Sequence, residues 1–178
     1  MVSEAGTTEE PSASKVGPSL LKLAPRFLLV YAVLLGIYIW ASGNTRFMVN
    51  AEVVTATVAG GLMKLTGVAA SRVGTFIDVP GRQLVIGPDC TAISILVLFV
   101  ALIAAYPAKI SSRLLGILGG TLVVLAANLV RLVAVAHISR APDAVFNTAH
   151  DFLFQVGMVA VALGVWAYWL SFVRRRES

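Results

Sequence analysis

Charged side chains are scarce in this sequence of 178 residues, where Asp, Glu, Lys and Arg together make up 13%. A soluble globular domain has about 25% charged residues, whereas 58% of this chain is hydrophobic. Such a chain cannot cover a folded surface with polar groups, so we expect the lipid bilayer to be its solvent. The composition therefore predicts an all-α polytopic membrane protein with a single domain of several helices.

Cysteine is nearly absent as well. Cys90 is the single cysteine, which excludes an intramolecular disulfide and any multi-cysteine metal site. One cysteine and two histidines offer no recognised metal-ligand spacing, so no cofactor is expected. The net charge of +5 does not indicate a nucleic-acid partner, because the basic residues stand in short runs beside apolar segments, as membrane topology signals do.

Four apolar segments are candidates to cross the hydrocarbon core, which needs roughly 20 residues of helix. They occupy residues 20–41, 90–108, 114–130 and 152–173. Basic residues precede the first segment, separate the second from the third and follow the fourth, which places both termini in the cytoplasm. We expect a disordered cytoplasmic N-terminus (1–19), one transmembrane domain (20–173) and a basic cytoplasmic tail (174–178).

Residues 48–70 are ambiguous, because their composition is helical but they carry Glu52 and Lys64. A charge at the bilayer centre costs about 2.5–3.5 kcal/mol on insertion scales. We therefore expect a helix that lies on the outer membrane surface, or a re-entrant one. The alternative is a fifth crossing, which would move the N-terminus outside against its own basic residues.

Residues 73–86 alternate in polarity and are interrupted by Pro80-Gly81, a pair that suits the centre of a type II turn. The pattern predicts a β-hairpin that delivers the chain to Cys90. Because the edges of an open hairpin would be unpaired in lipid, this hairpin must lie outside the membrane or be covered by protein.

Threading the chain through the bilayer brings three residues to one depth. Cys90 and His150 each begin a helix that descends from the outer face. The helix of the third segment starts at Arg113, at the inner face, and Arg131 follows it by eighteen residues on the same helix. At a rise of 1.5 Å per residue, Arg131 lies about 27 Å closer to the outer face. Cys90, Arg131 and His150 are thus predicted to converge at the outer face.

A thiol, a guanidinium and an imidazole at one surface suit a cysteine nucleophile. A helix N-terminus or a nearby cation lowers the pKa of a thiol, and Arg131 could instead stabilise the oxyanion of a tetrahedral intermediate. His150 could take the thiol proton and return it to a leaving amine. Each residue also has a purely structural interpretation: a small buried apolar side chain, a snorkelling arginine and an interfacial histidine.

Neighbouring residues offer supporting roles. Asn128 shares a helix face with Arg131 and could hold the guanidinium or a substrate carbonyl. Asp89 would disfavour a thiolate, although it could cap the helix instead. Asp151 directly follows the proposed base, and successive helical residues do not face each other, which counts against it as the group that orients the imidazole. His137, outside by the same threading, is the rival base.

At these residues the chain resembles the exosortase/archaeosortase family, polytopic membrane proteins regarded as cysteine transpeptidases. The family pattern is Cys-Ser/Thr-Gly opening one helix, Asn-x-x-Arg near the end of the next, and a His, often followed by Asp, opening a third. Here the pattern reads Cys90-Thr91-Ala92, Asn128-x-x-Arg131 and His150-Asp151, within a resemblance over about residues 48–173. Ala92 departs from the usual Gly.

The resemblance implies a bacterial exosortase, because His150 stands where archaeal members have a second Arg. The short chain resembles the compact type, with exosortase H as the subtype considered. It implies cleavage of a C-terminal sorting signal, comprising a short motif, a transmembrane helix and a basic tail, on membrane-anchored substrate proteins. The reaction would occur at the outer face of the inner membrane, and the acyl end would pass from Cys90 to an acceptor.

A second hypothesis is a non-catalytic membrane protein, either an assembly factor or a small transporter subunit. Its polar residues would then mark a binding or permeation path, the default suspicion for ionisable groups inside a membrane.

Overall fold

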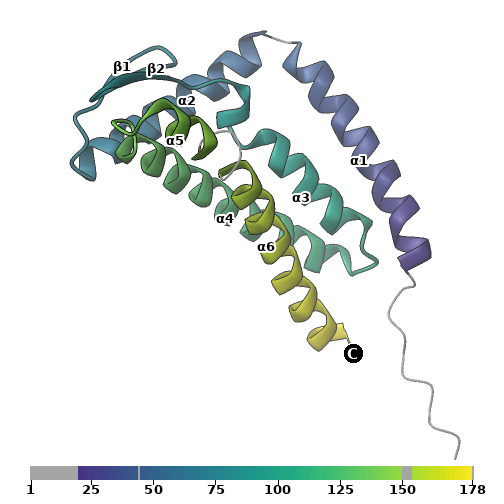
Figure 1. Ribbon diagram of the computed structural model, residues 1–178. Coiled ribbons are helices and arrows are strands. Elements are labelled where there is room, and N and C mark those ends of the chain that lie inside the picture. Colours follow the sequence, from purple (N-terminus) through teal and green to yellow (C-terminus); the bar gives the residue numbers. More distant parts are fainter. Residues whose placement is uncertain (1–19, 44, 150–153, 178) are drawn as a thin grey trace, which may run out of the picture.

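The computed structural model describes residues 20–43, 45–149 and 154–177 (Figure 1). Its elements are α1 (Leu20–Ser42), α2 (Thr45–Leu65), β1 (Ser71–Val73), β2 (Phe76–Val79), β3 (Arg82–Val85), the 3₁₀ turn η1 (Pro88–Cys90), α3 (Ile93–Ala105), α4 (Ile110–His137), α5 (Asp143–Asn147) and α6 (Phe154–Glu177). The protein is mostly helical, as predicted.

The long helices alternate in direction (Figure 1). The start of α1, the end of α3, the start of α4 and the end of α6 lie at one end of the molecule, whereas the sheet, η1 and α5 gather at the other end. Two buried clusters follow this division. One joins α2, the sheet and the second half of α4, and the other joins α3, α4 and α6.

Within the described residues, three helices are long and apolar enough to cross a membrane: Leu23–Ser42, Ile110–His137 and Phe154–Arg176. The fourth predicted span is shorter than expected. Helix α3 has 13 residues and is therefore about 20 Å long, against a hydrocarbon core of about 30 Å. It starts late, after the η1 turn, and it ends before Pro107 because Tyr106 is extended, as the residue preceding a proline usually is.

Helix α4 is longer than predicted, since it continues through Asn128 and Arg131 to His137. Its 28 residues span about 42 Å, which exceeds the hydrocarbon thickness by about 12 Å. Asn128 and Arg131 do not interrupt the helix, because the apolar residues that follow them, including Leu132 and Val135, are buried beneath the sheet region. The second half of α4 thus supports structure beyond a membrane-length span.

The predicted hairpin is confirmed by the antiparallel pairing of β2 with β3. Gly81 between them has a φ of +98°, which is the positive value that a type II turn requires after Pro80. The sheet also has a third strand, β1, paired with β2. The sequence pattern missed it because all three of its residues are exposed and carry no alternation.

The sheet covers one end of the bundle with an apolar face. Ile77, Val79, Leu84 and Ile86 alternate along β2 and the segment after the turn, and all four are buried in the cluster that α2 and α4 complete. Arg82 fastens this sheet to the chain after α4: its Nε donates to the Ser139 carbonyl at 2.7 Å, and its Nη2 donates to the Ala141 carbonyl at 3.0 Å.

Helix α2 confirms that residues 48–70 are largely helical, and it is not among the three membrane-length apolar helices. Its placement on the outer surface, or as a re-entrant segment, stays a prediction. The predicted disordered segment 1–19 lies outside the described residues. Arg174, Arg175 and Arg176 of the predicted basic tail form the last turn of α6, and the cytoplasmic location of this tail stays a prediction.

Candidate active site

Cys90 ends the η1 turn and its side chain is 5% exposed. The turn is closed by the Cys90 N–H, which donates to the Gly87 carbonyl at 2.9 Å. The Thr91 hydroxyl donates to the Pro88 carbonyl at 2.7 Å. Cys90 therefore does not open α3 as the sequence pattern predicted. It lies three positions before the first helical residue, Ile93, on a separate hydrogen-bonded turn.

Ala92 connects this turn to α3 and has φ +62° and ψ +3°. Among the described residues it is the one non-glycine residue with a positive φ. This left-handed conformation costs an L-residue roughly 1–2 kcal/mol, whereas glycine adopts it freely. The geometry explains why a glycine would suit the third position of the Cys-Thr-Ala motif.

Asn128 holds the peptide group of Cys90 from α4. Its Nδ2 donates to the Cys90 carbonyl at 2.7 Å, and the side chain is 2% exposed. The Asn128 amide therefore binds the backbone of the cysteine itself, in place of the guanidinium or substrate carbonyl that the sequence suggested. Its Oδ1 is buried and has no hydrogen-bond partner in the part of the chain that the structure describes.

Arg131 lies one turn further along the same face of α4. Its Nη1 donates to the Asp89 carbonyl at 3.3 Å, Arg131 is 6% exposed, and its Nε is buried without a partner among the described residues. Two consecutive carbonyls, those of Asp89 and Cys90, are thus held by side chains spaced i and i+3 on one helix. Such residues are neighbours on a helix surface.

The capping role predicted for Asp89 does not occur. The N-caps of η1 and α3 are Gly87 and Ala92, and neither makes a side-chain capping hydrogen bond. The backbone carbonyl of Asp89 accepts the hydrogen bond from Arg131, and Asp89 is exposed.

Of the two candidate bases, the structure describes His137, whereas His150 and the adjacent Asp151 lie outside the described residues. His137 is exposed, and its Nδ1 lies 2.9 Å from the Val133 carbonyl of its own helix. At 100° per residue, His137 is half a turn around α4 from Asn128. It therefore occupies the opposite side of the helix from the residue that holds Cys90.

The structure therefore brings Asp89, Cys90, Asn128 and Arg131 together by direct hydrogen bonds. The acceptors in these bonds are backbone carbonyls, and no sequence pattern marks them because every residue has one. The Asn-x-x-Arg spacing was the available signal that two polar side chains point the same way.

Comparison with known proteins identifies a family for the chain. A family model described as transmembrane exosortase (Exosortase_EpsH) matches residues 15–170, a range that contains every candidate site residue. No curated protein and no solved structure matches the chain. The family match extends over most of the sequence, and the chain therefore belongs to the transmembrane exosortase family.

Proposed function

We propose that this protein is a cysteine transpeptidase of the bacterial inner membrane that cleaves C-terminal sorting signals of membrane-anchored substrate proteins. The observation that carries the proposal is the double hold on the thiol-bearing turn. Asn128 donates to the Cys90 carbonyl and Arg131 donates to the Asp89 carbonyl. Each of these buried side chains also has one polar atom without a partner among the described residues, and burying such an atom costs free energy. A role beyond packing would explain why both side chains are there.

The proposed reaction has two steps. The Cys90 thiolate attacks the carbonyl carbon of the scissile peptide, the C–N bond breaks, and the leaving amine receives a proton from His150. The acyl group is then a thioester on Cys90. An acceptor amine or another nucleophile attacks it, loses its proton to the base, and releases the thiol.

Arg131 is proposed to stabilise negative charge beside Cys90. Its guanidinium contacts the backbone of the preceding residue, so the cation lies close to both the thiolate and the oxyanion that forms from the substrate carbonyl. A fixed cation in a site with little water stabilises such charge more strongly than water does. Its Nε, which has no partner in the described structure, is the group available for this task.

Substrate access requires the site to open. Cys90 is 5% exposed and packs in the cluster that contains Ile86, Leu132 and Val135. A peptide can reach the sulfur only after a covering segment moves or the substrate displaces it. A sorting signal that enters beside a transmembrane helix would supply the apolar surface for this displacement.

The test is processing of a co-expressed substrate that carries a motif, a transmembrane helix and a basic tail. Cys90→Ala is expected to remain folded and inserted while processing is lost, because no other thiol exists in the chain. Arg131→Ala is expected to reduce processing at least about 100-fold, as loss of an oxyanion-stabilising donor does. Full processing by Cys90→Ala would show that Cys90 is not the nucleophile.

The proposed base has its own matched control. His150→Ala is expected to abolish processing and His137→Ala to leave it near the wild-type level, since His137 faces away from the Asn128 side of α4. Both variants change one histidine to alanine, so a general effect of histidine loss is controlled. Loss of processing in the His137 variant alone would move the base assignment to that residue.

The alternative function, a non-catalytic assembly factor or small transporter subunit, is favoured by the burial of the thiol, since a buried free cysteine is often inert. In that case Cys90→Ser would retain full function in cells. The same variant set therefore separates the two functions.

A further inference from the structure

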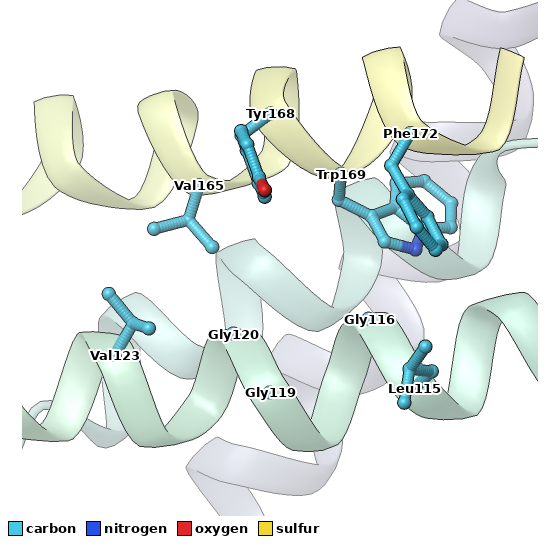
Figure 2. A pocket seen from close by; sticks show the side chains of 9 residues that line it. All are labelled: Leu115, Gly116, Gly119, Gly120, Val123, Val165, Tyr168, Trp169 and Phe172. Atoms are coloured by element: carbon cyan, nitrogen blue, oxygen red, sulfur yellow. The ribbon is translucent and has the colours of Figure 1, made fainter. Parts of the chain in front are cut away.

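A second feature of the molecule lies on the surface of the helical bundle, along α4 and α6. A cavity of about 340 Å³ runs between α4 and α6, and Figure 2 shows the side chains that form its walls. Its lining is almost entirely apolar and comes from Leu115, Gly116, Gly119, Gly120, Val123, Val165, Tyr168, Trp169 and Phe172. We refer to it as the α4–α6 groove.

Glycines on α4 create the floor of the α4–α6 groove. Gly116 and Gly120 are covered from within the bundle, because a Cβ there would overlap the Trp169 indole and the Phe99 ring. Gly119 differs, since a Cβ at this position would meet nothing within 4 Å. The groove is therefore open at Gly119, with the exposed residues Leu115 and Tyr168 beside it.

One end of the groove is cationic. Arg175 and Arg176 follow Phe172 by three and four positions on α6, so they extend the same helix face. The Arg176 guanidinium lies 4.7 Å from the centroid of the Phe172 ring. Among the residues whose side chains the structure describes, the one ion pair joins Arg82 to Asp143, and neither arginine pairs with a carboxylate of that set.

The start of α4 adds to this positive end. The antiparallel helices bring the first turn of α4 beside the last turns of α6, as the bond from Trp169 Nε1 to the Ser112 carbonyl at 2.9 Å records. The first turn of α4 contains no acidic residue. A helix N-terminus carries partial positive charge, which adds to that of the arginines.

We propose that the α4–α6 groove binds an anionic phospholipid, with one acyl chain along the glycine floor and the phosphate beside Arg175 and Arg176. Lipid fits because the groove is apolar along its length and positive at one end. A substrate transmembrane helix fits less well, because the basic tail implied for the substrate would meet like charges there. This site is independent of the proposed reaction and can be measured without it.

Native mass spectrometry of the purified full-length protein tests the proposal with phosphatidylglycerol and phosphatidylcholine of identical acyl chains. Wild type is expected to retain phosphatidylglycerol in preference to phosphatidylcholine. The double variant Arg175→Gln/Arg176→Gln should lose this preference, by roughly fivefold for each arginine removed. Equal retention of the two lipids by wild type would overturn the proposal.

The groove floor is tested separately by Gly119→Leu, which fills the open position. The matched control is Gly36→Leu on α1, where a Cβ also meets nothing within 4 Å. Lipid retention should fall several-fold in the first variant and stay unchanged in the second, with thermal unfolding measured to confirm that both are folded. If Gly119→Leu kept its lipid but lost substrate processing, the groove would belong to the substrate helix and the lipid proposal would be wrong.

Discussion

At the scale of single residues, the thiol-bearing turn is defined by its backbone. Cys90 lies on a 3₁₀ turn whose two last carbonyls accept hydrogen bonds from Asn128 and Arg131. Ala92 then reverses the sign of φ before α3 begins. The position of the sulfur therefore depends on one strained residue and two buried donors.

The strain at Ala92 leads to a contrast between two substitutions. Ala92→Gly relieves about 1–2 kcal/mol of left-handed strain but removes a buried methyl group worth about 0.8 kcal/mol and gains chain entropy in the unfolded state. These terms nearly cancel, so the free energy of unfolding should change by less than about 1 kcal/mol.

Ala92→Val, in contrast, should destabilise the protein by about 2 kcal/mol or more, because a β-branched residue tolerates positive φ poorly and this site is 1% exposed. Thermal unfolding in detergent measures both variants. A valine variant as stable as wild type would contradict the left-handed conformation.

The donor at Asn128 leads to a second residue-level prediction. Asn128→Ala leaves the buried Cys90 carbonyl unsatisfied, which should cost about 1–3 kcal/mol. It should also loosen the turn, so that maleimide alkylates Cys90 faster than in wild type. Mass spectrometry can follow this reaction unambiguously, because the chain has one cysteine.

The control for this prediction is Asn50→Ala, which changes an exposed asparagine on α2. It should leave both the alkylation rate and the stability as they are in wild type. Equal alkylation rates in the two variants would mean that Asn128 does not hold the cysteine turn.

At the scale of elements, the two halves of α4 have different structural roles. Its first half packs through glycines against α3 and α6, and its second half carries Asn128 and Arg131 and supports the sheet. Small residues let transmembrane helices approach closely. The close packing of these glycines fixes the position of α4 along its axis, and this position determines where Asn128 and Arg131 contact the cysteine turn.

The glycines of α4 give an element-level prediction. Gly116→Ala and Gly120→Ala should each destabilise the bundle by about 1–3 kcal/mol, because the new methyl group overlaps Trp169 or Phe99. Gly119→Ala, with open space around its Cβ, should be neutral or stabilising by up to about 1 kcal/mol through helix propensity. Thermal unfolding of the three variants checks the order, and equal effects at all three positions would refute the close packing.

At the scale of the whole molecule, alternating helix directions place the two functional regions at opposite ends. The sheet and the Cys90 turn lie at one end, and the basic residues of α6 lie at the other (Figure 1). Basic residues favour the cytoplasmic side, so we expect the sheet to face outward. The proposed peptide chemistry and the proposed lipid headgroup site would then lie on opposite sides of the membrane.

Labelling of intact cells tests this orientation. In a Cys90→Ala background, Gln83→Cys places a thiol on the exposed edge of β3, and Ser111→Cys places one at the exposed start of α4. A membrane-impermeant maleimide should label the first variant in intact cells and the second only after the membrane is opened. The reverse result would invert the predicted topology.

The sequence by itself determined the membrane environment, the helical class and the hairpin, because hydrophobic length, charge position and the Pro80-Gly81 pair are local patterns. It also placed Cys90 near Arg131 through the threading of the chain across the bilayer, and it placed Asn128 beside Arg131 because helix spacing fixes which side chains share a face. These features depend on short stretches of chain whose physical preferences are readable one at a time.

Tertiary structure alone decided how those partners meet. The bond from Asn128 to Cys90 joins residues 38 positions apart, and it forms because the second half of α4 packs beside the cysteine turn and under the sheet. Between this turn and α3, Ala92 has a left-handed conformation, and Cys90 is thereby separated from the helix that it was expected to open. No local pattern encodes these results, because each depends on where a distant helix supplies a donor or an apolar face.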